Sequence, residues 1–448
     1  MLYIIASALA GLAVFVGVFG QSPGKKNFGS NHFPRGPNYR PHFRVLAMIY
    51  RAMYRLGLRP GAINIQHYHD LIDSAPSKHF GPQDDCHRSL RIFTRGVEAN
   101  PNISAIGRIM VRSALTRCLN ARFNVMKFVD EHPEIVDVKI DRPIIIVGLP
   151  RTGSTLLQGL MSRDPASRSP YFFEMIQFHN PTPPTTKEGF ATDPRIKMTE
   201  DRLKTLDSLA PGSVAEMSKS HPARAFIVDE ELMIMFHQLV LEFYLLAAGD
   251  EFFNTFVDCT HKEYAYIYTK RFIQMMQWSW APDSHWVLKS PFHSLYMEDL
   301  MKQFPDARIV ITHRNVHSVV PSFAKLIEVQ AWQFFEDATV DRRIAGRYAV
   351  IASQKMIEGV ERFRKFHTGT KPFDCRYPEL VKDPVAMVKR IYDHFDMDFT
   401  PAFENALRSF INDNPQGKHG RNTYTLEDFG LSAQELDETF AEYQAQYA

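Results

Sequence analysis

Cysteine is scarce in this chain of 448 residues, which has four, at positions 86, 118, 259 and 375. No two of them have the close spacing of zinc ligands, and so the sequence predicts no metal site. The segment His67–Asp70 contains two histidines and an aspartate, but no further ligand cluster accompanies it. The four thiols fit free cysteines and two disulfides equally well.

The chain also lacks an excess of either charge. It has 52 basic and 50 acidic residues and a net charge of +2, which gives no reason to expect nucleic acid as a partner. Hydrophobic residues make up 45% of the sequence and charged residues 23%, a composition typical of a folded chain with a large core. The length suits one large domain or two or three smaller ones.

A third absence is that of a lysine at the end of the glycine-bounded loop that follows residue 147. Residues 144–147 read as a buried strand, a loop bounded by Gly148 and Gly153 follows, and Ser154 begins a helical pattern. The glycines are spaced as in a Walker A loop, but Ser154 stands where the phosphate-binding lysine belongs. The positive charge is inside the loop, on Arg151. The sequence therefore argues against Mg²⁺-dependent phosphoryl transfer, which uses that lysine.

The same stretch predicts an anion site. Loop amides and the first N–H groups of a helix bind anions, and the helix dipole adds to that preference. Gly153 permits close approach of the backbone, while Thr152, Ser154 and Thr155 add hydroxyl donors. With the guanidinium of Arg151, this set suits a small tetrahedral anion.

A second basic strand end follows downstream. Residues 308–313 read as an apolar strand, and Arg314 comes directly after it, eight residues before Ser322 on a helical pattern. An arginine at a strand end and a serine on the next helix can hold one phosphate together. The two anion sites predict a ligand with phosphates at both ends.

Three further residues are candidates for proton transfer or charge stabilisation. The strand that includes Trp286 ends in Lys289, and His293 follows; both would face the loop if this strand belongs to the same sheet. Lys289 could stabilise charge on a leaving oxygen. Glu174 follows three aromatic residues after the loop's helix, where an apolar pocket would raise the pKa of its carboxyl group.

The stretch from Gly148 to Thr155 resembles the 5′-phosphosulfate loop of sulfotransferases, which use 3′-phosphoadenylyl sulfate (PAPS) as donor. The pair Arg314 and Ser322 resembles their 3′-phosphate site. The turn containing Lys418 and Gly420 is similar to their late Lys-x-Gly loop, which closes over the same phosphate. The resemblance covers roughly residues 140–440 as scattered motifs. It implies an α/β fold of the P-loop-like type, with a parallel sheet flanked by helices.

The implied reaction is in-line transfer of a sulfuryl group from PAPS to a hydroxyl or amine of a glycan, lipid or small-molecule acceptor, with no metal. Arg151 and the loop amides would hold the phosphosulfate, while Glu174 or His293 would take the acceptor's proton. Two alternatives stay open at this point. They are a P-loop kinase or nucleotide hydrolase, and a non-catalytic PAPS-binding membrane protein.

The N-terminus carries a separate signal. Residues 1–20 contain no charged side chain and, as a helix, are long enough to cross a bilayer. A cleaved signal peptide is the alternative, but its basic n-region is missing. We expect a single-pass signal anchor at residues 1–22 in the Golgi or another endomembrane. The side of the membrane on which the catalytic domain lies stays open.

The remaining chain divides into two predicted parts. Residues 23–137 read as a linker and a helical extension, and residues 138–448 as the sulfotransferase-like α/β domain. Residues 225–248 are strongly apolar but contain several acidic residues, which are costly in lipid. They predict a buried helix and not a second membrane span.

Overall fold

The computed structural model describes residues 41–59, 62–176, 178, 183–209, 214–215, 218, 224–258, 260–335, 341–414 and 424–447. The predicted membrane segment 1–22 lies outside these ranges, as do Lys418 and Gly420. Cys86, Cys118 and Cys375 are free thiols, and Cys259 lies outside the described residues.

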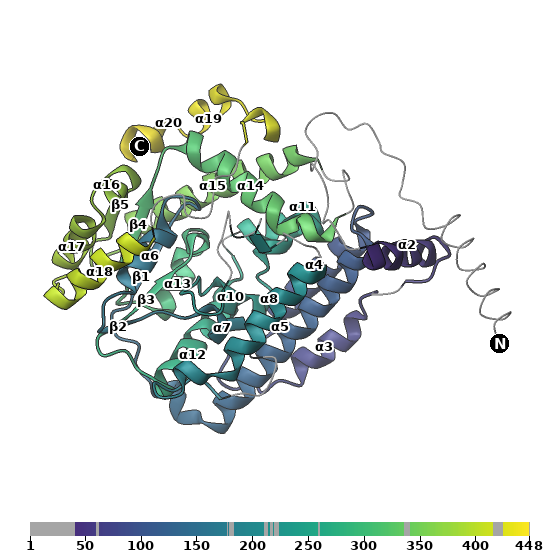
Figure 1. Ribbon diagram of the computed structural model, residues 1–448, viewed down its shortest axis with the longest axis horizontal. Helices are drawn as coiled ribbons and strands as arrows, with labels where there is room; N and C mark the ends of the chain where they lie inside the picture. Colours follow the sequence, from purple (N-terminus) through teal and green to yellow (C-terminus); the bar gives the residue numbers. More distant parts are fainter. Residues whose placement is uncertain are drawn as a thin grey trace.

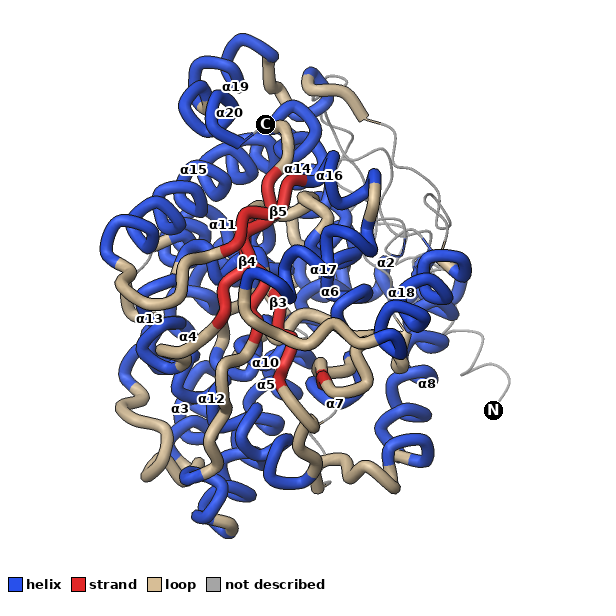
Figure 2. Tube along the Cα trace, turned by 90° about the vertical axis from the view of Figure 1, so that its left-hand side faces the viewer, coloured by secondary structure: helices blue, strands red, loops and turns tan. Residues whose placement is uncertain are grey.

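A parallel sheet of five strands lies at the centre of the part of the chain that follows residue 140 (Figure 2). The strand order is β2-β3-β1-β4-β5, which confirms the predicted parallel α/β fold. The strands β1, β3 and β4 coincide with the predicted ones, while the two-residue edge strand β2 is too short to leave a periodic signal. Their bounds are β1 Ile144–Gly148, β2 Ser167–Arg168, β3 His285–Lys289, β4 Arg308–His313 and β5 Phe373–Arg376.

The strand register brings the chemically important residues to one edge of the sheet. Strand β1 lies between β3 and β4, with Ile146 opposite Lys289 and Gly148 opposite Thr312. All three strands are parallel, so their carboxyl ends meet at the same edge. In open α/β sheets this edge is where ligands bind.

Both faces of the sheet are covered by helices, which explains why its central strands are buried along their whole length. Ile144 and Ile146 face one hydrophobic cluster, while Ile145 and Val147 face the other. The helices of the smaller cluster are α6 Ser154–Met161, α16 Tyr377–Lys382, α17 Pro384–His394 and α18 Pro401–Asp413.

The larger cluster joins the opposite face of the sheet to the helices that precede it in the chain (Figure 1). Buried side chains of the predicted helical extension belong to this same core, among them Leu90 and Leu119. Its helices are α3 Ile65–Asp73, α4 Asp84–Ala99, α5 Ala105–Glu131, α7 Phe172–Ile176, α10 Leu232–Met235, α11 Leu245–Val257, α12 Glu263–Ser279, α13 Met297–Gln303, α14 Val316–Ala331, α15 Arg342–Phe366, α19 Ala433–Thr439 and α20 Ala441–Tyr447. Two further helices are α2 Pro41–Arg55 and α8 Pro194–Leu209.

The apolar segment 225–248 is buried, as predicted, but it is not one helix. It breaks at Leu239, whose φ of 61° lies in the left-handed region, and only short helical turns lie on either side. The break brings acidic residues of this segment to the edge of the sheet. Among the described residues no single helix meets the length and hydropathy expected of a membrane span, and one pair bent by 71°, Leu232–Gln238 with Glu242–Val257, does.

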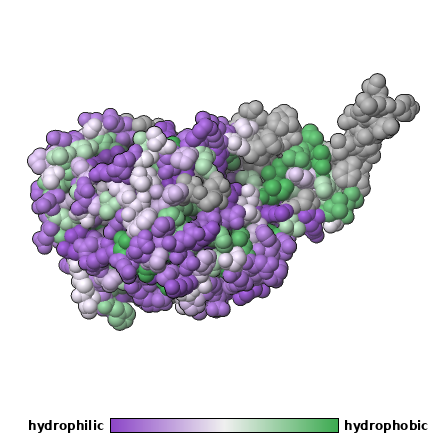
Figure 3. All heavy atoms as spheres, turned by 90° about the horizontal axis from the view of Figure 1, so that it is seen from below, coloured by the Kyte–Doolittle hydropathy of each residue, from purple (hydrophilic) through white to green (hydrophobic). Residues whose placement is uncertain are grey.

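Exposed hydrophobic residues gather near the N-terminal end of the described chain. Figure 3 shows a mostly hydrophilic body and a hydrophobic patch beside the atoms drawn in grey. Val45, Leu56 and Leu58 are each about half exposed, at 48%, 51% and 53%. These residues lie in or directly after α2 and form the "N-terminal apolar patch".

Candidate active site

The loop between β1 and α6 has an unusual backbone. Gly148, Arg151 and Gly153 all have positive φ angles, of 127°, 68° and 90°. A Cβ atom on Gly148 would lie 2.4 Å from the backbone oxygen of Thr312, and one on Gly153 would lie 2.8 Å from the Tyr377 ring. Both glycines are therefore required, because the loop packs closely and adopts angles that side chains disfavour.

Three hydroxyl groups, those of Thr152, Thr312 and Ser294, hold this loop in place. The Thr152 hydroxyl donates to the Leu149 carbonyl at 2.6 Å and lies 2.6 Å from the hydroxyl of Thr312. The Gly148 N–H donates to the Ser294 hydroxyl at 2.9 Å. Thr152, a predicted ligand residue, thus shapes the loop, whereas Ser154 and Thr155 at the start of α6 line the adjoining pocket. The N-terminus of α6 gives that pocket a positive end.

The structure brings the two predicted anion sites together. Arg314 donates to the backbone carbonyl of Arg151 at 2.9 Å, and the Arg151 guanidinium donates to the Ser322 hydroxyl at 3.0 Å. The Arg314 guanidinium also lies over the Tyr377 ring, 4.1 Å from its centroid. Burial lowers the pKa of Arg151, and the charge of Arg314 adds to this shift.

This arrangement fits a polyanionic ligand. Two guanidinium groups lie beside a helix N-terminus, and no carboxylate within the described ranges lies at ion-pair distance from Arg314. Adjacent cations in a buried site are stabilised when an anion neutralises them. Among the described residues, no group of three or more His, Cys, Asp or Glu could hold a metal ion.

Lys289 lies at the end of β3, as predicted, and its side chain is fully buried. Its ammonium group lies 2.5 Å from a carboxylate oxygen of Glu230 and donates to the Thr155 hydroxyl at 3.3 Å. Lys289 therefore connects the first turn of α6 to Glu230, an acidic residue that the sequence did not point to. The only signal for Glu230 was the cluster of acids at 229–231 within an apolar segment.

His293 lies in a short 3-10 turn, η5 Pro291–Leu295, behind the loop. One ring nitrogen is 2.7 Å from a Glu231 carboxylate oxygen, and the other is 2.7 Å from the Tyr266 hydroxyl. Glu231 also accepts the backbone N–H of Lys289 at 2.7 Å. His293 is 1% exposed and does not line the pocket. The network instead positions the end of β3.

Glu174 lies in α7 and is likewise sealed from the pocket. Its carboxylate receives a hydrogen bond from Arg168 at 2.6 Å and another from the backbone N–H of Tyr171 at 3.0 Å. The Arg168 guanidinium lies between the rings of Trp280 and Trp286, at 4.4 and 4.8 Å from their centroids. The structure does not bring Glu174 together with Arg151 or Lys289. Both of its oxygens are satisfied within a structural ion pair.

A pocket of about 450 Å³, open solvent included, adjoins the loop. Its polar lining comes from three parts of the chain: the loop and α6, the broken segment 225–248, and α14. The polar lining residues are Arg151, Ser154, Thr155, Glu230, Glu242 and Gln330. Burial raises the pKa of Glu242 well above its usual value, and the nearby charge of Glu230 adds to the effect.

Comparison with known proteins agrees with this geometry. Residues 143–401 match the model of the sulfotransferase family. The sulfotransferase STF9 of Mycobacterium avium has a similar structure, with a TM-score of 0.73, 27% identity, and coverage of 85% of this chain and 96% of that one. The sulfotransferase STF1 of Mycobacterium tuberculosis has a similar fold, with a TM-score of 0.70, 23% identity, and coverage of 86% and 100%.

Two curated relatives, from Mycobacterium bovis and Mycobacterium tuberculosis, are both named omega-hydroxy-beta-dihydromenaquinone-9 sulfotransferase Stf3. Each is 24% identical over 297 residues, which are 64% of this chain and 70% of the relative. The family match spans more than half of the chain and includes the loop, Lys289, Arg314 and Ser322. The chain is a member of the sulfotransferase family and is a sulfotransferase enzyme.

Proposed function

We propose that this enzyme transfers the sulfuryl group of PAPS to the hydroxyl group of an acceptor molecule. The observation that carries the proposal is the direct contact between the two anion-binding groups. Arg314 donates a hydrogen bond to the backbone carbonyl of Arg151, and the Arg151 guanidinium donates one to the Ser322 hydroxyl. A donor with a 5′-phosphosulfate and a 3′-phosphate on one ribose needs two neighbouring anion-binding groups.

The residues present fit this donor. The loop, the N-terminus of α6 and Arg151 would hold the phosphosulfate end, while Arg314 and Ser322 would hold the 3′-phosphate. Lys418 and Gly420 stay predicted contacts to the same phosphate. When bound, the donor supplies an electrophilic sulfur and a bisphosphate leaving group. Arg151 lines the pocket and Lys289 lies behind Thr155, so that their positive charges would stabilise that leaving group.

We infer that Glu230 is the base for the acceptor's proton. It lines the pocket and is held by Lys289 next to Thr155, whereas Glu174 and His293 are sealed within their own hydrogen-bond networks. In the proposed step a bond forms between the acceptor oxygen and sulfur, and the bond from sulfur to the phosphate oxygen breaks. The acceptor's proton goes to Glu230, and the electron pair leaves with adenosine 3′,5′-bisphosphate.

His293 has a positioning role in this account. Its hydrogen bond to Glu231 fixes the carboxylate that accepts the Lys289 N–H, and so it fixes the neighbouring Glu230 as well. Lys289 then holds the Glu230 carboxylate against the start of α6. The geometry resembles the orienting partners that hold general bases in many enzymes.

The hydroxyl acceptor is supported by the relative whose name states a hydroxylated menaquinone as its substrate. We also propose association with a membrane through the N-terminal region. The predicted span at residues 1–22 and the N-terminal apolar patch support this, and Asp70 is the first acidic residue of the chain. A basic N-terminal region is attracted to anionic lipid surfaces.

The proposed function is tested with the purified full-length chain in detergent and PAPS labelled with ³⁵S. We expect transfer of label to an alcohol acceptor without added Mg²⁺, and inhibition by adenosine 3′,5′-bisphosphate. Hydrolysis of ATP in the presence of Mg²⁺, together with no turnover of PAPS, would contradict the proposal and favour a nucleotide hydrolase.

A further inference from the structure

A second carboxyl group lies in the pocket beyond Glu230. Glu242 begins the 3-10 turn η4 Glu242–Tyr244, just after the break in segment 225–248. It is 4% exposed, and one of its oxygens accepts a hydrogen bond from the Gln330 amide at 3.3 Å. The proton-transfer scheme above uses neither residue. A buried acid facing a pocket needs a polar partner, because isolation in an apolar setting is costly.

The rest of this part of the pocket is apolar. Its lining side chains are Met233, Phe243, Phe292 and Leu326. Two of these are fixed by neighbouring rings: Phe243 packs edge-on against Phe236 with centroids 4.9 Å apart, and Phe292 packs against Phe323 at 6.0 Å. The wall is therefore preformed, as is usual for sites that bind small apolar molecules.

The protonation state of Glu242 suits recognition of a hydroxyl group. Its surroundings include Glu230, Asp229, Lys289 and Gln330, and burial is the largest influence on its pKa, which is raised. A protonated carboxyl group both donates and accepts hydrogen bonds, as a hydroxyl group does. With the Gln330 amide beside it, the pair presents complementary donors and acceptors to an alcohol.

We propose that Glu242 and Gln330 form an acceptor-binding pair that holds the reacting hydroxyl near Glu230, and that the acceptor is an uncharged apolar alcohol. This inference rests on the proposed function, since it names the substrate class of the same site. The hydroxyl binds the pair, and the hydrocarbon part packs on Met233, Phe243, Phe292 and Leu326. Glu242 and Gln330 are positioning residues for the acceptor, distinct from the base.

The residues that line the pocket also disfavour two other classes of acceptor. An anionic acceptor would lose its hydration beside two carboxyl groups, which is unfavourable for either protonation state of Glu242. A polyhydroxylated sugar would bury several hydroxyl groups against four apolar side chains with few partners. An alcohol with a single hydroxyl group at one end carries no charge and leaves no further hydroxyl group without a partner.

The first experiment compares an apolar alcohol with a carboxylate of the same chain length and with a polyol. The full-length enzyme is given PAPS with 1-octanol, octanoate or sorbitol, and kcat and KM are measured. We expect sulfation of 1-octanol, no inhibition of that reaction by octanoate at the KM of the alcohol, and no sulfation of sorbitol. Octanoate competing as strongly as 1-octanol, or sorbitol used in preference to it, would overturn the proposal.

The second experiment changes the pair. Gln330→Leu and Glu242→Leu should each raise the KM for 1-octanol about threefold to tenfold, the loss expected for one hydrogen bond, with kcat nearly unchanged. Glu242→Gln should restore most of the affinity because an amide also donates and accepts. Glu404→Gln and Gln434→Leu, both on exposed helix surfaces, are the matched controls and should leave KM unchanged.

Binding measurements distinguish a failure of the acceptor-binding pair from a failure of the proposed function. Calorimetry of 1-octanol with protein saturated by adenosine 3′,5′-bisphosphate should show the same loss in the leucine variants, while their affinity for the bisphosphate stays at the wild-type value. If the bisphosphate binds normally but the variants bind and sulfate 1-octanol like wild type, the pair is not the acceptor site. If the bisphosphate does not bind the wild-type protein, the proposed function itself fails.

Discussion

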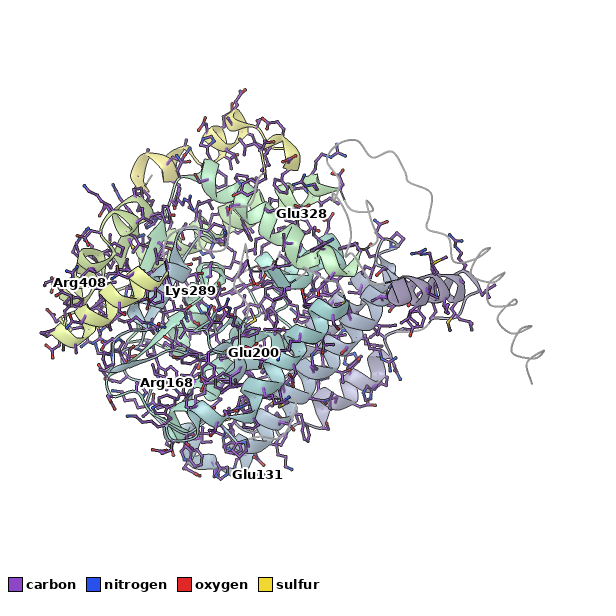
Figure 4. All side chains as sticks on the ribbon, viewed as in Figure 1. Glu131, Arg168, Glu200, Lys289, Glu328 and Arg408 are labelled. Atoms are coloured by element: carbon purple, nitrogen blue, oxygen red, sulfur yellow. The ribbon has the colours of Figure 1, made fainter. Side chains whose placement is uncertain are left out.

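Two buried ion pairs with similar chemistry lie in different parts of the molecule. Glu174 is paired with Arg168 beneath the edge strand β2, and Glu230 is paired with Lys289 at the carboxyl edge of β3. Figure 4 shows Arg168 and Lys289 well apart, with Lys289 nearer the centre. Both pairs have short hydrogen bonds, but only Glu230 lines a pocket beside the loop.

The two pairs differ in their surroundings, and this difference is the basis for assigning the proposed base to Glu230. Both oxygens of Glu174 receive hydrogen bonds from the protein, and its cation is enclosed by two tryptophan rings. Glu230 instead shares its cation with Thr155, in the first turn of α6 directly after the loop. Burial and a charged partner alone do not identify a base, because access to the reacting atoms is also needed.

The largest expected effect is on catalysis at Glu230. Glu230→Gln should lower kcat for sulfation about 10²- to 10⁴-fold, the usual contribution of a general base, while the affinity for adenosine 3′,5′-bisphosphate is kept. Steady-state kinetics and calorimetry on the same sample measure both. A kcat within a factor of three of wild type would remove Glu230 from the mechanism.

The next effect is on stability at Glu174. Glu174→Gln leaves the buried charge of Arg168 without its counter-ion and should lower the free energy of unfolding by about 3 kcal/mol, with kcat per folded molecule unchanged. Denaturant unfolding measures this loss. Glu404→Gln, in the exposed pair with Arg408, is the control and should change stability by less than about 1 kcal/mol.

The opposite outcome for Glu174→Gln would exchange the roles of Glu174 and Glu230. If Glu174→Gln leaves stability intact and abolishes turnover, Glu174 is the base and the arrangement around Arg168 changes when the donor binds. A loss of both would be separated by Arg168→Met, which breaks the same ion pair without removing the carboxyl group.

The smallest effect concerns the pH dependence at Glu242. Its pKa is raised in the folded protein from the usual 4.5, so the folded state keeps a proton that the unfolded state loses above that pH. The contribution to stability is therefore greatest below pH 4.5 and declines as the pH rises toward the folded pKa.

Glu242→Gln removes this titration and gives the measurement. The variant should gain stability relative to wild type between pH 4.5 and 7, and the difference should be smallest at the acid end. Denaturant unfolding at several pH values provides the comparison. A difference that is constant with pH would show that Glu242 is ionised in the folded protein.

Much of this arrangement was predictable from local patterns. The strand before Gly148, the helix after Gly153 and the strands ending at Lys289 and His313 all have apolar runs that end in polar turns, and each was found. Arg151, Arg314 and Ser322 were predicted from residue type and position relative to those strands. Such features depend on short stretches of sequence, which is why periodicity and motif spacing reveal them.

The parts that were missed depend on tertiary contacts. Residue type and spacing do not show that Arg168 folds back onto the Glu174 carboxylate, and the role of Glu174 as a base stays a prediction. Glu230 and Glu242 lie in a segment that reads as one buried helix, and they reach the pocket because the chain breaks at Leu239. No periodic pattern predicts that break, since neither glycine nor proline occurs there.

The most direct test of the account is calorimetric titration of the full-length protein with adenosine 3′,5′-bisphosphate and, separately, with ATP and Mg²⁺. We predict tight binding of the bisphosphate, weakened about tenfold or more by Arg314→Ala because a charge-assisted contact to the 3′-phosphate is lost, and weaker binding of ATP. Equal or tighter binding of ATP, or bisphosphate affinity that does not depend on Arg314, would contradict the paired anion sites on which the proposed function rests.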